Sequence, residues 1–144
     1  MQIREILTLK TDEIHSIAPT DLVSSAVAKL VGLGVGSLVV FVDGKMVGLV
    51  TERDIVRGMM SHGCDLKDAQ VSSIMVTEPV VADADDSVDY ARDVMTKSHI
   101  GHLPILDGGK LLGIISFHDV ARACLKEANF ENSLLKRYIK HWPE

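Results

Sequence analysis

The sequence predicts an α/β (α+β) fold built from two similar halves. Laid on itself at an offset of 65 residues, the chain matches without a gap from Ile14 to Arg57, and such internal similarity is typical of a duplication. Short runs of β-forming residues alternate with stretches of helical period in both halves. The identical pairs are Asp21/Asp86, Val23/Val88, Ala26/Ala91, Gly36/Gly101, Leu38/Leu103, Gly44/Gly109, Lys45/Lys110, Gly48/Gly113, Asp54/Asp119 and Arg57/Arg122.

Each half is predicted to run strand, helix, strand, strand, helix. A half of about 60 residues would bury too little surface alone, so the two should pack sheet to sheet about a pseudo-two-fold axis. The chain then divides into a first repeat with its lead-in at 1–67, a second repeat at 68–128 and a helical tail at 129–144, all within one module.

Each repeat opens with a short apolar lead-in and a short strand. The lead-ins are residues 3–9 and 71–75, and the strands are expected at 14–17 and 80–82. Polar residues follow each strand and can start a helix. We therefore expect one amphipathic helix after each strand, because apolar residues then recur every three to four positions.

These helices are predicted at 22–33 and 88–96, and each is followed by a hairpin. In the first repeat an apolar run ends at Asp43-Gly44 and resumes at Met46, and an Asp-Gly step between such runs strongly indicates a tight turn. The second repeat does the same at Asp107-Gly108-Gly109. A three-stranded sheet is therefore expected in each half.

The final helix of each repeat should begin near Thr51 and Ser116. The first is expected to end at His62-Gly63, because glycine can adopt a left-handed conformation there. The second runs on towards Tyr138, with a weakness at 129–133, and is longer than the repeat requires.

The strand-to-helix junction is the most informative stretch of each repeat. Gly48-Leu49-Val50-Thr51-Glu52-Arg53-Asp54 returns as Gly113-Ile114-Ile115-Ser116-Phe117-His118-Asp119. A hydroxyl residue placed here can cap the helix, whose free N–H groups suit a phosphate. An ionised aspartate only accepts hydrogen bonds, so it suits the two hydroxyls of a ribose. The plainer alternative is that these residues only cap the helix.

Composition limits the classes of function. A net charge of −5 and a pI near 5.6 argue against nucleic-acid binding. Cys64 and Cys124 are far apart, so neither a zinc site nor a redox pair is indicated. No apolar run reaches the roughly 18 residues of a membrane helix, so we expect a soluble, cytoplasmic protein with no membrane partner, no metal and no catalytic cofactor.

With the duplication, the two junction motifs and the strand from Ile100 to Asp107 in view, the chain resembles a tandem cystathionine β-synthase (CBS) domain pair. The resemblance covers nearly all of residues 1–140. It implies a regulatory module, not an enzyme, that binds adenosine-containing ligands in the clefts between its halves. Such ligands are AMP, ADP, ATP, S-adenosylmethionine and NAD(H), and they would serve energy sensing or other signal transduction.

The resemblance also implies residue roles. Asp54 and Asp119 would bind ribose hydroxyls, with Thr51 and Ser116 near ribose or phosphate. His102 would reach phosphate. The residues implied around adenine are His15, Val35, Gly36 and Ser37 in the first repeat and Val80, Ile100, Gly101 and His102 in the second.

The residue before each motif aspartate differs between the repeats, so the two sites need not bind equally. Arg53 offers a permanent fork of donors to phosphate. His118, like His102, would change charge near pH 6 to 7. The alternative for Arg53 and His118 is that both are ordinary solvated surface residues.

Two other classes of function are weighed against a nucleotide sensor. An enzyme is disfavoured because the histidines are scattered and no nucleophile or phosphate-loop motif occurs. A structural interaction domain with vestigial sites is disfavoured by the aspartate present in both motifs.

Partners are also predicted. A homodimer is expected, because the last helices of both repeats carry apolar residues with no evident partner within one pair: Ile55, Val56, Met59, Met60, Val120, Ala121 and Cys124. The tail carries an apolar stripe, Leu134, Leu135, Tyr138 and Ile139, together with Phe130 and Trp142. That stripe either packs on its own dimer, which we favour, or docks an effector protein.

Overall fold

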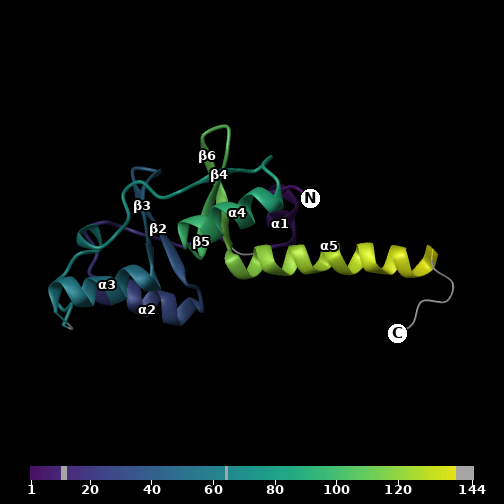
Figure 1. Ribbon diagram of the computed structural model, residues 1–144. Coiled ribbons are helices and arrows are strands. Elements are labelled where there is room, and N and C mark those ends of the chain that lie inside the picture. Colours follow the sequence, from purple (N-terminus) through teal and green to yellow (C-terminus); the bar gives the residue numbers. More distant parts are fainter. Residues whose placement is uncertain (11–12, 64, 139–144) are drawn as a thin grey trace.

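The fold is known from a computed structural model that describes residues 1–10, 13–63 and 65–138, and it contains two three-stranded sheets (Figure 1). The elements of the first half are α1 Ile3–Leu9, β1 Ser16–Ile17, α2 Val23–Leu33, β2 Ser37–Val42, β3 Lys45–Thr51 and α3 Glu52–His62. Those of the second half are the 3-10 turn η1 Val71–Ser73, β4 Ala82–Asp83, α4 Val88–Ser98, β5 His102–Asp107, β6 Lys110–Ser116 and α5 Phe117–Tyr138. The predicted fold class and repeat order are confirmed.

The two sheets share one topology. The first strand pairs parallel with the second, and the second pairs antiparallel with the third, in both β1-β2-β3 and β4-β5-β6. Each hairpin register shifts at the same place, between Val40 and Phe41 and between Ile105 and Leu106. Asp43 and Gly44 both have positive φ, 52° and 77°, as the predicted tight turn requires. The duplication thus extends to backbone detail.

The first strand of each sheet is shorter than the apolar run predicts. In β1 only Ser16 and Ile17 pair with β2, and β4 begins at Ala82 rather than Val80. Each of these first strands therefore contributes only two paired residues to its sheet. Residues such as His15 and Val80 therefore lie just before a strand, where side chains can face a cleft.

Each half has its own apolar core. Leu38, Val40 and Val50 are fully buried in the first, as are Leu103, Ile105 and Ile115 in the second. Their side chains come from the central strand and the last strand, covered by the helices. These cores fix the ends of the strands that carry the predicted site residues.

The lead-ins cross between the halves. Helix α1 buries Ile3 and Ile6 in the core of the second repeat, whereas Val71 of η1 lies in the core of the first. Leu7 packs directly on Gly113, and Met75 packs in the same way on Gly48. A methyl built on either glycine would lie 2.9 Å from that side chain, so neither position has room for a larger residue. The boundaries at 67/68 and 128/129 stay predictions, and packing crosses the first of them.

Helix α5 is continuous over 22 residues and passes the predicted weakness at 129–133 without a break. Its far half projects away from both sheets (Figure 1). Within the described ranges, no helix has both the length and the apolar character needed to cross a membrane. The tail residues Ile139 and Trp142 lie outside the described residues, as does Cys64.

Candidate functional site

The first junction motif forms a closed cap. Thr51 is the N-cap of α3, and its Oγ accepts the Asp54 N–H at 3.3 Å. Asp54 Oδ2 in turn accepts the N–H and the hydroxyl of Thr51 at 2.8 and 2.9 Å, which makes a reciprocal capping box. Asp54 is only 6% exposed, and Arg57 lies 3.8 Å from its Oδ1. Asp54 therefore caps α3, and its ligand role stays a prediction.

The second motif repeats this cap with one change of donor. Ser116 N–H donates to Asp119 Oδ2 at 2.8 Å, and Asp119 N–H donates to Ser116 Oγ at 3.1 Å. The ammonium of Lys10, at the end of α1, donates to the same Oδ2 at 2.8 Å and to the carbonyl of Ile114 at 3.0 Å. Burial opposes ionisation of Asp119, but the bonds from Lys10 and Ser116 outweigh it and hold the pKa of this carboxyl below its ordinary value.

The expectation of free N–H groups at these helix starts needs correction. The first N–H of α3, on Glu52, donates to the carbonyl of Gly36 at 3.2 Å. Phe117 N–H donates to the carbonyl of Gly101 in the same way at 2.8 Å. With the N–H groups of Asp54 and Asp119 also used, the helix ends offer a phosphate fewer free donors than the motif suggests.

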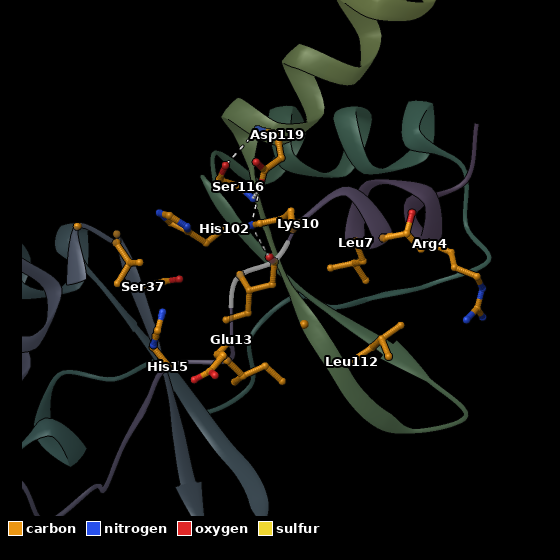
Figure 2. A pocket seen from close by; sticks show the side chains of 17 residues that line it. Arg4, Leu7, Lys10, Glu13, His15, Ser37, His102, Leu112, Ser116 and Asp119 are labelled. Carbon is orange, nitrogen blue, oxygen red and sulfur yellow. Dashed lines mark hydrogen bonds and ion pairs between the residues drawn. The ribbon is translucent and has the colours of Figure 1, made fainter.

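A cavity of about 560 Å³ lies between the two repeats (Figure 2). This volume is in the usual range for a small-molecule site, roughly 300–1,000 Å³. The cavity brings together seven of the predicted residues: His15, Val35, Gly36 and Ser37 of the first repeat with His102, Ser116 and Asp119 of the second. The residues assigned to adenine thus face a hydroxyl and carboxylate pair from the other repeat across one space.

His102 crosses from the second repeat to the first. A methyl built on Gly36 would lie 2.8 Å from its Nε2 and 3.1 Å from Oε1 of Glu52, so the imidazole fills the space that glycine leaves. Burial lowers the pKa of His102 below its ordinary value; Lys10 lowers it further, while the carboxylates of Glu52, Asp119 and Asp54 oppose the shift. The expected charge change near pH 6 to 7 is corrected to a lower pH for this residue.

The remaining predicted residues lie outside that cavity. Arg53 donates to the carbonyl of His99 at 2.8 Å, at the left-handed end of α4 and directly before Ile100 and Gly101. The Arg53 guanidinium therefore bonds the first repeat to the second. His118 Nε2 accepts from Arg122 at 2.7 Å on the exposed face of α5, and Val80 is 42% exposed.

Sequence reasoning missed the cavity wall that α1 supplies. Arg4, Leu7 and Lys10 line the cavity, together with Glu13 and Leu112. Lys10 and Asp119 stand 109 residues apart, so no local motif joins them. The sequence carries one signal for Lys10. When the two lead-ins are aligned at the repeat offset, Lys10 lies opposite the apolar residue Met75, so the repeats differ in charge at this position.

Comparison with known proteins agrees with this architecture. The family model described as CBS domain matches residues 3–61 and 71–126, one match for each repeat. The chain belongs to the CBS domain family.

Three CBS relatives illustrate the likeness. The mitochondrial CBS domain-containing protein CBSX3 of Arabidopsis thaliana is 32% identical over 125 residues, 83% of this chain and 61% of its own length. A CBS-domain protein of Burkholderia ambifaria has a structure with a TM-score of 0.83 and 31% identity, covering 88% of this chain and 95% of its own. CBSX2, solved in complex with AMP, has a TM-score of 0.73 and 25% identity, covering 88% of this chain and 98% of its own.

Proposed function

We propose that this chain is a regulatory module that binds an adenosine-containing ligand, such as AMP, ADP, ATP, NAD(H) or S-adenosylmethionine, between its CBS repeats. One observation carries the proposal: the cavity places His15, Val35 and Gly36 of one repeat opposite Ser116 and Asp119 of the other. An apolar and main-chain wall suits a purine, and a carboxylate suits a ribose diol. The complex of CBSX2 with AMP supports this class of ligand.

The module is proposed to act by binding and not by catalysis. The two motif carboxylates are held by internal bonds, Asp119 at the cavity by Lys10 and Ser116, and Asp54 outside it by Thr51. No pairing of a nucleophile with a base is seen among them. Ligand binding across the two repeats would change their relative orientation. A partner that contacts both repeats would detect that change, and the module would thereby report on adenine nucleotides.

We further propose that the protein works as a homodimer. Val56, Met59 and Met60 are 65%, 37% and 92% exposed on α3, and Leu125 is 64% exposed on α5. The original basis for the dimer needs one correction. Val120 is fully buried in its own repeat, and Ile55 and Cys124 also pack against their own cores, so these three are not part of a free face.

A second candidate function is a structural interaction domain with vestigial sites. The observation that favours it is that Oδ2 of each motif aspartate is already used by donors within the chain. A thermal shift assay with a panel of adenine nucleotides separates the two candidates. A ligand at 100 times its dissociation constant stabilises the fold by about 2.7 kcal/mol, a shift of several degrees, whereas vestigial sites give no shift with any nucleotide.

A further inference from the structure

The carboxylate predicted to hold ribose is not equally accessible in the two repeats. In the first repeat the second donor to Asp54 Oδ2 is the hydroxyl of Thr51, which belongs to the same cap. In the second repeat that place is taken by the ammonium of Lys10, which reaches Asp119 from the other end of the chain. The ammonium of Lys10 thus bonds Oδ2 of the aspartate in the second repeat, whereas in the first repeat the cation beside the aspartate, Arg57, lies 3.8 Å from the other oxygen, Oδ1.

The bonds around Asp119 show what a ribose would have to displace. Ser116 N–H and Lys10 both reach Oδ2, and a carboxylate oxygen accepts about two hydrogen bonds. The Ser116 donor is backbone and fixed by the start of α5. Lys10 is the donor that can leave, because it sits on a flexible four-carbon stem. A diol that spans both oxygens of Asp119 therefore moves the ammonium aside.

The displaced ammonium needs another anion. Lys10 is 24% exposed by its side chain and would keep only the carbonyl of Ile114, and a partly buried cation without a counter-charge is costly. The other strong cation at the wall, Arg4, is already bonded to Asp85 at 2.9 Å and to Asp107 at 3.1 Å. Lys10 is therefore the cation that a ligand's own anion would meet.

We propose that Lys10 makes this cleft selective for phosphorylated adenosine ligands, by passing its ammonium from Asp119 to the ligand phosphate as the ribose takes the carboxylate. This inference rests on the proposed function and names the ligand class within it. A nucleotide replaces the ion pair that it breaks. Neutral adenosine breaks the same ion pair and supplies no anion to Lys10. The difference between its affinity and that of AMP should therefore exceed the contribution of the phosphate contacts alone.

The test is calorimetric titration of AMP and adenosine into the full chain and its variants at one ionic strength. The wild type is expected to prefer AMP. In Lys10→Met the affinity for AMP should fall about tenfold or more, equal to about 1.4 kcal/mol. Adenosine affinity should hold or rise in this variant, because Asp119 Oδ2 then keeps only the Ser116 N–H as a donor. The ratio of AMP affinity to adenosine affinity therefore falls, because the first affinity falls and the second holds or rises.

Two variants serve as controls. Lys45→Met removes the same charge from an exposed position on the β2–β3 hairpin and should leave both affinities within about twofold, as expected for an exposed charge that solvent screens. Lys10→Arg keeps the charge and should keep a preference for AMP. A melting curve for each variant checks that it is folded.

Three outcomes would overturn the inference. If Lys10→Met keeps the wild-type ratio of AMP to adenosine affinity, Lys10 does not select phosphate, although the proposed function stands. If the wild type itself binds both ligands equally, the inference fails in the same way without reference to any variant. If the wild type binds neither ligand, the inference fails, and the thermal shift panel decides whether the proposed function fails with it.

Discussion

Gly36 of the first repeat lies directly against the imidazole of His102 of the second, so close that a methyl on Gly36 would stand 2.8 Å from His102 Nε2. The backbone of Gly36 has no positive φ that would explain the glycine. Its small size is explained instead by the neighbour across the cleft. This contact joins the two repeats at the wall assigned to adenine.

Gly36→Ala is therefore expected to push His102 into the cavity and weaken nucleotide binding. Overpacking of this kind costs about 1–3 kcal/mol, which corresponds to a loss of about 5- to 150-fold in affinity if the whole cost falls on ligand binding. Gly32→Ala is the control, because Gly32 lies in α2 outside the implied site and a methyl there meets nothing within 4 Å. Titration of AMP into both variants checks the prediction, and equal losses in the two would contradict it.

The lowered pKa of His102 predicts a pH dependence of stability. Burial lowers this pKa in the folded state, whereas the unfolded chain keeps a value near about 6.5. Between the two values the unfolded state binds more protons, so the free energy of unfolding falls as the pH drops below about 6.5 and is fully restored above it.

The measurement is urea unfolding of the wild type and His102→Gln between pH 5 and 8. The variant should lose the part of the pH dependence that lies below about 6.5, because glutamine does not titrate there. Wild-type and variant curves that stay parallel across the whole range would show that His102 does not contribute.

The repeat order, both hairpins and both helix caps could be predicted from the sequence because each rests on local chemistry. Asp43-Gly44 requires positive φ at both positions, and Thr51 with Asp54 closes a cap over three residues. Half of the implied site residues meet in one cavity for the same reason, since the duplication and the strand ends determine where they point.

The cross-repeat contacts could not be predicted, because they depend on tertiary packing alone. The lead-in α1 precedes the first repeat in the chain but packs on the second, and this alone brings Lys10 to Asp119. The left-handed His99 gave no sequence signal either, yet its carbonyl holds Arg53. The phosphate roles assigned to Arg53 and His102 from residue type stay predictions.

The far half of α5 predicts a dimer contact. Phe130, Leu134 and Leu135 are 66%, 38% and 57% exposed on a helix that projects from the module (Figure 1). The full chain should scatter light with a mass near twice 15.7 kDa, since so much apolar surface favours a second copy. A monomer at micromolar concentration would contradict the homodimer.

Removal of Glu131–Glu144 then tests whether the tail packs on its own dimer or docks an effector protein. If the tail packs on its own dimer, the shortened chain should lose the dimer or melt at a much lower temperature. A stable dimer that still binds nucleotide without the tail would instead leave effector docking as the better explanation.

The most direct test of the account is titration of AMP, ATP and NAD into the wild type and into Asp54→Ala, Asp119→Ala and the double variant. Each single change should weaken binding at its own site by about 1–3 kcal/mol, because a buried hydrogen-bonding group loses its partner. Loss of a cap also lowers stability by about 0.5–2 kcal/mol, so each variant is first shown to be folded. The account predicts that the folded double variant binds none of these ligands. Undiminished binding by that variant would contradict the assignment of the site.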